Sequence, residues 1–554
     1  MDFNSDYLTK QIIAYIGNKR RLLDLIYKAI ISSVEKIQPG IKFFDVFAGS
    51  GIVSRLGKEL NFEVITNDWE TYSYILSNGL IKTNKKDISK IFGSEEDFSN
   101  ILESLNNLPQ PKESDCYISK YYAPEKFDID DVDFRKERLF YTRDNALIID
   151  KIRNYIETKY PEKEQFKAKN ILLSILIYEA ATHTNTSGVF KAFHKGFGGH
   201  NRDAMKRILS PIRMSIPTLT DSDFPVHVYQ EDSNELVKKI MNIDIAYLDP
   251  PYNQHQYGSN YHMLNTIAIW DKIPAPLDLN EKGVLKEKAA IRKDWIKTKS
   301  SYCYQDSAVS SFNDLIENLD AKHILINYST DGIIPFDVMK DICAKKGKIS
   351  IVTNEYTKYR GGKQSNNRLN TNIEFILTID TEKKSTRYSI EKVESVVNKK
   401  RILLMFKQRY SFSKLKNHSL AMIGNDIVFD TGNRELIIPS NCYFELFPVE
   451  EINDLSIEET DVLYNILSRC VCFTKEEELE EIISKINGDI ENNLYFIKLI
   501  PDTLKKLAHK KNKVRFYYWL DEIKKIEKNH GELYSLIKEK TIAIEELAGK
   551  RFNN

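Results

Sequence analysis

A segment near the N-terminus combines apolar runs with turn and helix signals in an order that few folds accommodate. Residues 42–47 (Lys-Phe-Phe-Asp-Val-Phe) form a short apolar run that leads into the Ala-Gly-Ser-Gly turn at 48–51. A helical pattern covers residues 52–60, and a second apolar run, 62–66, ends just before Asp68. This order of elements, a strand, a Gly-rich turn, a helix, a second strand and an acidic residue, is typical of the beginning of a nucleotide-binding α/β sheet. The sequence therefore predicts an α/β protein with a Rossmann-like sheet.

The strand pattern breaks off after this segment and resumes much later. Between residues 84 and 230, charge runs, prolines and mostly helical periodicity replace it, and residues 17–37 upstream predict an amphipathic helix. We therefore expect a discontinuous sheet domain, residues 1–83 and 231–385, interrupted by a largely helical insertion, residues 84–230. Later strands are expected at Ile243–Leu248, His323–Tyr328, Lys348–Thr353 and Ile373–Ile379.

The C-terminal third has a different character. Residues 395–450 predict short strands with turns at 424–425 and 431–432, and residues 455–550 predict strongly charged helices. We expect a C-terminal accessory domain of α+β type over residues 395–554, which is a candidate for DNA or partner binding.

Composition excludes several classes of protein. The 554 residues carry 80 basic and 79 acidic side chains, a net charge of +1, which excludes a polybasic whole-chain binder but not a local basic groove. The six cysteines include no CxxC pair, so no zinc ribbon is expected. No run of about 18 apolar residues predicts a membrane span, and the acidic N-terminus is unlike a signal peptide. These features favour a reduced, cytoplasmic protein.

The motif Asp249-Pro-Pro-Tyr252 carries the most specific chemical signal. Two prolines after a predicted buried strand force a rigid extended turn and remove two N–H donors while keeping the carbonyl acceptors. The Asp249 carboxylate, the Pro250 carbonyl and the Tyr252 ring then form a fixed array. Such an array suits a planar aromatic amine, with its N–H groups on the two acceptors and its ring on Tyr252. A purely structural turn would rarely need all three groups.

The Gly-rich turn is a weaker signal that has two interpretations. Gly49 and Gly51 are not followed by a third glycine, so the dinucleotide pattern GxGxxG is absent and a nucleoside without a pyrophosphate is favoured. Asp68, 17 residues beyond Gly51, is placed to accept hydrogen bonds from ribose hydroxyls. A tight turn and a solvated acid at a strand end remain the structural alternatives.

Four motifs that follow one another along the chain resemble, in their residues and in their order, those of the D12-class DNA adenine-N6 methyltransferases. This group includes the DNA adenine methylases. The likeness is patchy over residues 12–272 and follows the family's α arrangement, as in restriction–modification enzymes. It resides in Tyr-Ile-Gly-Asn-Lys-Arg-Arg-Leu-Leu at 15–23, Asp-Val-Phe-Ala-Gly-Ser-Gly at 45–51, Asn67-Asp68 and Asp249-Pro-Pro-Tyr252, with a similar Tyr257–His262 segment behind them.

The resemblance implies the S-adenosyl-L-methionine-dependent methyltransferase sheet and S-adenosylmethionine as the cofactor. Lys19 would meet the methionine carboxylate, Asp68 the ribose and Asp232 the adenine. The full set of implied cofactor residues is Tyr15, Lys19, Asp45, Phe47, Gly49, Asp68, Asp232 and Asp249. No metal is expected.

The resemblance also implies a reaction at adenine N6 in double-stranded DNA. The N6 lone pair is delocalised into the ring, and acceptors at Asp249 and Pro250 would localise it. The base is out of reach inside a duplex and would be flipped out and stacked on Tyr252. Asp249, Pro250 and Tyr252 are thus the predicted catalytic residues, and a cognate restriction endonuclease is the expected partner.

DNA contacts are predicted outside these motifs. The segment from Thr182 to Arg202 mixes amide, hydroxyl and basic groups with glycines, and its Asn-Thr-Ser-Gly-Val-Phe stretch is similar to one in the family. An ordinary surface loop is the alternative, and a metal site at its histidines is not expected. The predicted DNA-binding residues are Asn185, Ser187, Gly188, Lys191, Lys195, Arg202, Tyr257, Tyr359, Arg360 and Lys363.

Other functions stay open on the sequence alone. Cytosine N4 or RNA is an alternative target for the same fold, although Asp before Pro-Pro-Tyr favours adenine. A combined nuclease–methyltransferase would need an Asp followed by Glu-x-Lys in residues 395–554, and no convincing pair occurs there. A catalytically silent DNA-binding protein is disfavoured by the complete Asp249-Pro-Pro-Tyr252 motif.

Overall fold

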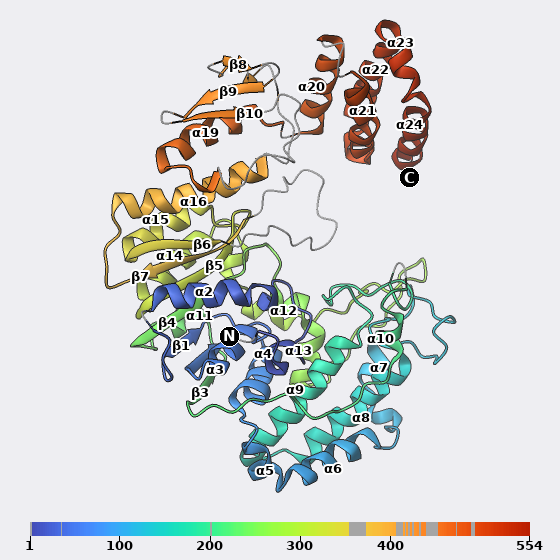
Figure 1. Cartoon of the computed structure of the whole chain (residues 1–554). Coiled ribbons are helices and arrows are strands. Elements are labelled where there is room, and N and C mark those ends of the chain that lie inside the picture. Colours follow the sequence, from blue (N-terminus) through green and yellow to red (C-terminus); the bar gives the residue numbers. More distant parts are fainter. Residues whose placement is uncertain are drawn as a thin grey trace. The chain divides into compact units, whose positions relative to one another are not determined.

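The fold was obtained as a computed structural model of the whole chain (Figure 1). Contacts divide the chain into two compact units, residues 1–354 with 374–386 and the remaining residues. The structure describes residues 3–34, 36–199, 202–353, 373–405, 411, 414–415, 417–418, 421–423, 426–431, 434–438, 452–472, 474–488 and 493–553.

A seven-stranded sheet forms the centre of the first unit, in the order β3-β2-β1-β4-β5-β7-β6. Strands β3, β2, β1, β4 and β5 are parallel to one another, whereas β7 is antiparallel to both β5 and β6. This mixed α/β sheet confirms the predicted fold class. The strands are β1 (Lys42–Asp45), β2 (Glu63–Asn67), β3 (Val226–Tyr229), β4 (Ile243–Leu248), β5 (Ala321–Ser329), β6 (Lys348–Thr353) and β7 (Glu374–Asp380).

Helices cover both faces of the sheet. The Phe375 ring of β7 lies edge to face with Phe336, 5.3 Å away in α15 (Phe336–Lys346). The next residue, Ile376, belongs to the hydrophobic core that also contains the buried side chains of α2 (Leu23–Ser33). Successive residues of a strand point to opposite faces, so α15 and α2 lie on opposite sides. Helix α3 (Ile52–Glu59) joins α2, and α14 (Ala308–Asn318) packs on α15.

The helical part of the first unit has its own core, centred on α9 (Phe166–Thr182). Most of α9 is buried because its apolar residues surround the helix instead of forming one stripe. Its neighbours are α4 (Thr71–Leu76), η2 (Ser77–Lys82), α8 (Arg143–Lys159) and α13 (His262–Ile269). Further short elements are α1 (Asp6–Thr9), η1 (Lys19–Leu22), α5 (Asp87–Phe92), α6 (Glu95–Asn106), η3 (Glu113–Asp115), α7 (Ile118–Tyr121), η4 (Lys163–Gln165), α10 (Met205–Leu209), α11 (Ser233–Leu236), α12 (Tyr257–Asn260), η5 (Asp294–Thr298) and η6 (Ser301–Cys303).

Two expectations about boundaries need correction. The predicted insertion, residues 84–230, contains β3 at its end, and β3 pairs with β2 in the sheet. The strand escaped detection because it is a four-residue edge strand with a polar, exposed His227. The predicted helix over residues 17–37 is also shorter, because it begins as η1 and α2 ends at Ser33.

The second unit combines a small sheet with helices. Strands β8 (Ala421–Ile423), β9 (Asp426–Asp430) and β10 (Glu435–Ile438) are antiparallel, in the predicted region. Residues 395–405, however, belong to helix α16 (Arg387–Met405) and are not strands. The other helices are α19 (Ile457–Cys470), α20 (Lys475–Gly488), α21 (Asn493–Leu507), η7 (Lys510–Asn512), α22 (Lys513–Asn529), α23 (Gly531–Ser535) and α24 (Lys538–Asn553). No helix in the described ranges combines the length and apolar character of a membrane span.

Candidate active site

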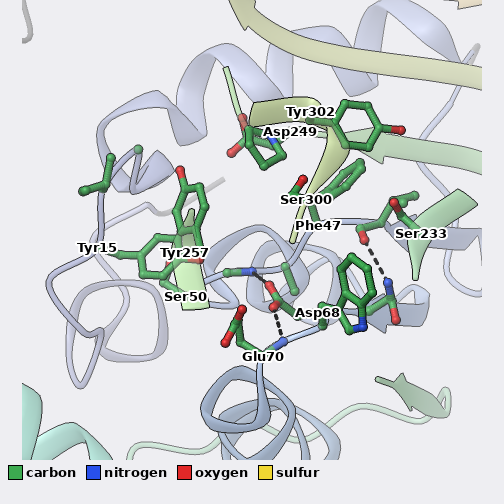
Figure 2. A pocket seen from close by; sticks show the side chains of 18 of the residues that line it. Tyr15, Phe47, Ser50, Asp68, Glu70, Ser233, Asp249, Tyr257, Ser300 and Tyr302 are labelled. Atoms are coloured by element: carbon green, nitrogen blue, oxygen red, sulfur yellow. Dashed lines mark hydrogen bonds between the residues drawn. The ribbon is translucent and has the colours of Figure 1, made fainter. Parts of the chain in front are cut away.

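A cavity opens at the carboxyl ends of β1, β2 and β4, where the strand order reverses between β1 and β4 (Figure 2). Parallel sheets bind ligands at this switch point because neighbouring loops diverge there. The cavity holds about 940 Å³ of empty space, its open mouth included, which is the size of a small-molecule site. Its lining comes from residues within 15–19, 46–53, 67–70, 231–233, 247–257 and 298–302.

The Gly-rich turn and the acid after β2 meet in this cavity. The Gly49 N–H donates a hydrogen bond to Asp68 Oδ2 over 2.7 Å, and the Glu70 N–H donates to Asp68 Oδ1 over 2.9 Å. Burial raises the pKa of Asp68, and these backbone donors oppose the rise. Gly49 has a φ of +54°, and a Cβ there would lie only 2.7 Å from Tyr15 Cε1. Only glycine allows this close approach of turn and ring.

Tyr15 belongs to a cluster of aromatic rings beside the cavity. Its ring stacks on Tyr261, with centroids 4.7 Å apart, and on Tyr257, with centroids 5.4 Å apart. Tyr261 Oη accepts a hydrogen bond from the Ile16 N–H over 2.7 Å, which ties the N-terminal segment to this cluster. Tyr257 therefore forms part of the cavity wall. Its predicted contact with DNA stays a prediction.

Asp249 follows β4 directly and forms an ion pair in the cavity. Lys19 Nζ lies 3.1 Å from Asp249 Oδ1 and 5.3 Å from the centroid of the Tyr252 ring. Burial raises the pKa of Asp249 to about 6, although Lys19 opposes the rise. Burial alone would lower the pKa of Lys19, but Asp249, Tyr252 and Glu374 outweigh it and the pKa is raised. Both groups of the pair are therefore charged at neutral pH.

The turn after Asp249 is held firmly in place. The Tyr252 carbonyl accepts a hydrogen bond from the Ile333 N–H over 3.1 Å, and its ring lies edge to face with Tyr328 at 5.9 Å. Pro251 lines the cavity, whereas Pro250, whose carbonyl is the predicted second acceptor, is buried and lies outside the lining.

Two acids predicted to bind the cofactor have structural partners. Asp45 is buried outside the cavity lining, which corrects its assignment, and it accepts a hydrogen bond from Ser54 Oγ over 2.6 Å. Burial raises the pKa of Asp45 to about 7. Asp232 does line the cavity, but its Oδ1 accepts two backbone N–H groups at the start of α11. The cavity brings together the other predicted residues, Tyr15, Lys19, Phe47, Gly49, Asp68 and Asp249.

One wall of the cavity comes from a segment without any motif, residues 294–303, here called the wall segment. Gln256 holds it through two hydrogen bonds with Ser300: Gln256 Nε2 donates to the Ser300 carbonyl over 3.0 Å, and the Ser300 N–H donates to Gln256 Oε1 over 2.8 Å. Tyr302 lies edge to face with Phe47 at 5.4 Å. Sequence reasoning missed this wall because isolated Ser, Thr and Tyr residues between motifs carry no signal.

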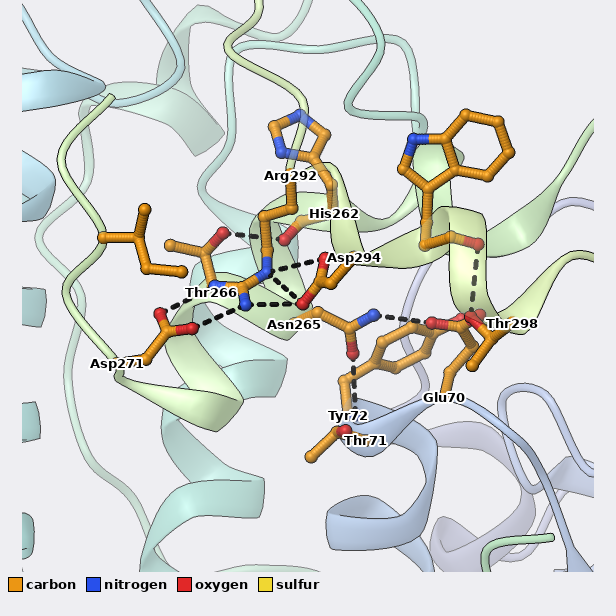
Figure 3. A network of polar contacts seen from close by, with 12 residues as sticks. Glu70, Thr71, Tyr72, His262, Asn265, Thr266, Asp271, Arg292, Asp294 and Thr298 are labelled. Carbon is orange, nitrogen blue, oxygen red and sulfur yellow. Dashed lines mark hydrogen bonds and ion pairs between the residues drawn. The ribbon is translucent and has the colours of Figure 1, made fainter. Parts of the chain in front are cut away.

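A network of polar contacts supports the wall segment at its start (Figure 3). The buried Arg292 guanidinium bonds both oxygens of Asp271, at 2.8 and 2.7 Å, and its Nε bonds Asp294 Oδ2 at 3.0 Å. Paired bonds of this kind fix geometry as well as charge. Beside it, Asn265 Nδ2 donates to Glu70 Oε2 over 2.5 Å, and burial raises the pKa of Glu70 to about 7.

The loop predicted to contact DNA is anchored by its own asparagine. Asn185 is 0% exposed, and its Nδ2 donates to the carbonyls of Leu139 and Gly196 over 3.0 and 3.3 Å. Its Oδ1 accepts the Gly198 N–H. The whole amide is thus occupied by backbone groups, so the structure corrects the predicted role: Asn185 shapes the loop and is not exposed to contact DNA.

Four other side chains of this loop that are predicted to contact DNA are exposed. The Phe190 N–H donates to the Asn260 carbonyl over 2.7 Å, and His262 Nε2 bonds the Phe190 carbonyl over 2.9 Å, so the loop is tied to α12 and α13 next to the cavity. Arg202 lies 3.6 Å from Asp130. Ser187, Lys191, Lys195 and Arg202 are exposed and Gly188 is half-buried, while Tyr359, Arg360 and Lys363 lie outside the described residues.

Metal ligands do not gather in the part of the chain that the structure describes, where no group of three or more His, Cys, Asp or Glu side chains could hold an ion. His183, one of the histidines in the loop region, instead bonds the Glu179 carbonyl through Nδ1 over 2.8 Å.

Comparisons with known proteins show the family of the chain. The profile of the D12 class N6 adenine-specific DNA methyltransferases matches residues 15–319. The chain is 32% identical to type II methyltransferase M.NlaIII of Neisseria lactamica over 366 residues, 65% of this chain and 96% of that protein. It is 31% identical to type II methyltransferase M.CviAII of Paramecium bursaria Chlorella virus 1, over 63% of this chain and 93% of that protein. It is 30% identical to type II methyltransferase M.FokI of Planomicrobium okeanokoites, over 62% of this chain and 49% of that protein.

Proposed function

Because the chain belongs to the D12 class of N6 adenine-specific DNA methyltransferases, we propose that it transfers a methyl group from S-adenosylmethionine to adenine N6, with Asp249 and Tyr252 holding the adenine. The enzyme is a DNA methyltransferase of the restriction–modification type, and DNA is its substrate. A cognate restriction endonuclease is the partner that we propose for it.

The cavity fits a nucleoside cofactor. Asp68 accepts one backbone N–H on each oxygen, and a carboxylate has about four acceptor positions, so lone pairs remain for two ribose hydroxyls. Asp232 keeps its Oδ2 for an adenine amine, because only Oδ1 caps α11. Lys19, with three N–H donors, serves both Asp249 and a ligand carboxylate. When bound, S-adenosylmethionine supplies a methyl group already activated by the sulfonium charge.

The Asp249 carboxylate then acts on the adenine amine. Its oxygens accept hydrogen bonds from N6–H, which draws the nitrogen lone pair out of the ring and aims it at the methyl group. Transfer would break the sulfur–methyl bond, leave its electron pair on sulfur, and form the N6–carbon bond. N6 would then carry one proton in excess, which a carboxylate with a pKa of about 6 can accept. Tyr252 offers its ring to the flipped base, and its backbone bond to Ile333 keeps that ring in place.

The exposed loop residues Ser187, Lys191, Lys195 and Arg202 are the proposed DNA contacts. Their loop is tied to the segment that follows Tyr252, so a base entering the cavity and the flanking phosphates would meet one rigid element.

The ion pair of Asp249 with Lys19, open to a cavity beside Tyr252, is the observation that carries this proposal. The test is to express the chain in a bacterium without DNA methylation and map modified bases by long-read sequencing. N6-methyladenine at one recurring motif supports the proposal, whereas methylcytosine or unmodified DNA from a folded, cofactor-binding protein contradicts it.

A matched pair of variants separates chemistry from folding. Asp249→Ala should abolish modification, while Asp244→Ala should retain it, because Asp244 lies on β4, the strand that leads to Asp249, but pairs with Lys322 at the surface. Full modification by Asp249→Ala would rule out the proposed mechanism.

A further inference from the structure

The end of α21 and the start of α22 carry an unusual concentration of positive charge. Residues 503–520 contain six Lys or Arg side chains and no acid, although the whole chain is nearly neutral. We call these six residues the basic corner: Lys505, Lys506, Lys510, Lys511, Lys513 and Arg515, all of them exposed. Helices α21 and α22 are labelled in Figure 1.

Helix electrostatics explain only part of this corner. Lys505 and Lys506 lie in the last turn of α21, where cations interact favourably with the helix dipole. Lys510, Lys511 and Lys513 precede or begin α22, where the dipole disfavours cations. Other helices of this unit begin with acids, as α19 does with Glu458 and Glu459. The three lysines therefore cost α22 some stability, which points to a role outside helix formation.

Ion pairing does not explain these lysines either. Within the described residues, none of Lys505, Lys506, Lys510, Lys511 and Lys513 forms an ion pair with a carboxylate, whereas Arg515 lies 3.3 Å from Glu476. By contrast, Lys524 and Lys525 farther along α22 and Lys538 at the start of α24 pair with Glu545, Glu522 and Glu527.

Exposed apolar side chains lie beside the unpaired lysines. Helix α22 already has a core face, formed by Phe516, Leu520 and Ile523. Val514 is 83% exposed and Tyr518 is 58% exposed, and the four-residue spacing places them on one face away from that core. A charged helix with one buried face accounts for Phe516, Leu520 and Ile523. It does not account for Val514 and Tyr518.

We propose that the basic corner is a second DNA-contacting surface, which binds duplex phosphates without reading sequence. Uncompensated lysines neutralise phosphates and release counterions, and Val514 and Tyr518 suit the apolar edges of the sugars between them. This inference rests on the proposed DNA methyltransferase function and adds a contact outside residues 15–319, which the family profile covers. Its consequence is stronger, salt-sensitive binding to any duplex.

The test compares two triple variants of the full-length protein with equal loss of charge. Lys510→Gln/Lys511→Gln/Lys513→Gln removes unpaired lysines, and Lys524→Gln/Lys525→Gln/Lys538→Gln removes paired ones. Affinity for a duplex without the methylation motif is measured by fluorescence anisotropy across a salt series. For the first variant we expect the slope of log K against log salt to fall by about 2 to 3, and affinity at about 100 mM salt to fall about 10- to 100-fold.

The control variant should keep the slope of the unmodified protein, and both variants should keep its circular dichroism. An unchanged slope in the first variant, or an equal fall in both, would overturn the inference and leave this surface to a protein partner. Turnover at saturating DNA should stay unchanged while KM for DNA rises. Failure of the proposed function would look different, because methyl transfer would then be absent while the salt slopes still differed.

Discussion

Lys19 sets the electrostatics of the reaction at the scale of single residues. It is buried beside Asp249, and its charge offsets part of the rise that burial imposes on the pKa of that carboxyl. Asp249 must be ionised to accept hydrogen bonds from N6, so activity should be lost as the pH falls through about 6.

Replacing Lys19 should shift the pH at which activity is lost on the acidic side of the pH–activity profile, here called the acid limb. Lys19→Met removes the neighbouring cation that lowers the pKa of Asp249, so the limb of kcat/KM should shift to higher pH and activity at neutral pH should fall at least about 10-fold. Profiles of kcat/KM from about pH 5 to about pH 9 report the free enzyme. Lys10→Met, at an exposed pair with Asp6, is the control. An unshifted limb in Lys19→Met would show that Asp249 is not the titrating group.

The wall segment depends on a clamp at the scale of elements. Gln256→Glu keeps the shape of the side chain but replaces the donor to the Ser300 carbonyl by an acceptor. We expect the Kd for S-adenosylmethionine to rise about 10-fold. The introduced carboxylate cannot donate a hydrogen bond to the Ser300 carbonyl, so the wall segment is no longer held in place. Gln254→Glu, exposed and two residues away, changes charge equally and should bind normally. Isothermal titration calorimetry measures both; equal affinities would contradict the clamp.

The contact of η2 with α9 depends on a missing side chain. A Cβ on Gly79 would lie 2.6 Å from the Asn170 carbonyl and clash with Ser174, so Gly79→Ala should destabilise the first unit by about 1 to 3 kcal/mol. Gly549 in α24 has open space within 4 Å of the position that a Cβ would take, and Gly549→Ala should be neutral or stabilise its helix by about 0.5 to 1 kcal/mol. Urea unfolding of each variant checks the opposite signs; a stable Gly79→Ala would contradict the packing.

The two units determine behaviour at the scale of the whole molecule. Among the described residues, the last strand of the seven-stranded sheet is β7, which ends at Asp380. The two large core clusters of the first unit contain no described residue beyond Ile376. About a third of the chain lies outside the match to M.NlaIII, although 96% of that relative is covered. Methyl transfer is therefore expected to reside in the first unit.

A chain that ends at Thr386 should fold and methylate DNA. It retains every described residue of the cavity, so cofactor affinity should match that of the full chain, while binding to DNA should weaken because the basic corner is lost. Cooperative thermal unfolding and modification mapping check this outcome. Failure of the shortened chain to fold would show that the second unit completes the core.

The sequence by itself determined the local chemistry of the site. The turn at Gly49, the strand-end Asp68 and the rigid Asp249-Pro-Pro-Tyr252 segment are recognisable because backbone geometry and donor loss are properties of neighbouring residues. These local signals sufficed for the α/β class and for placing Gly49, Asp68 and Asp249 in one site.

Only the tertiary structure decided which distant segments meet. Asn185 looks like a DNA contact in sequence, but backbone groups occupy its side-chain amide, and the ring of Tyr257 stacks on that of Tyr15, more than 240 positions away in the chain. The wall segment reaches the cavity through Gln256, 44 residues from Ser300, and the short strand β3 gains its place only by pairing with β2. Burial and pairing depend on long-range packing, which composition and periodicity of one segment do not encode.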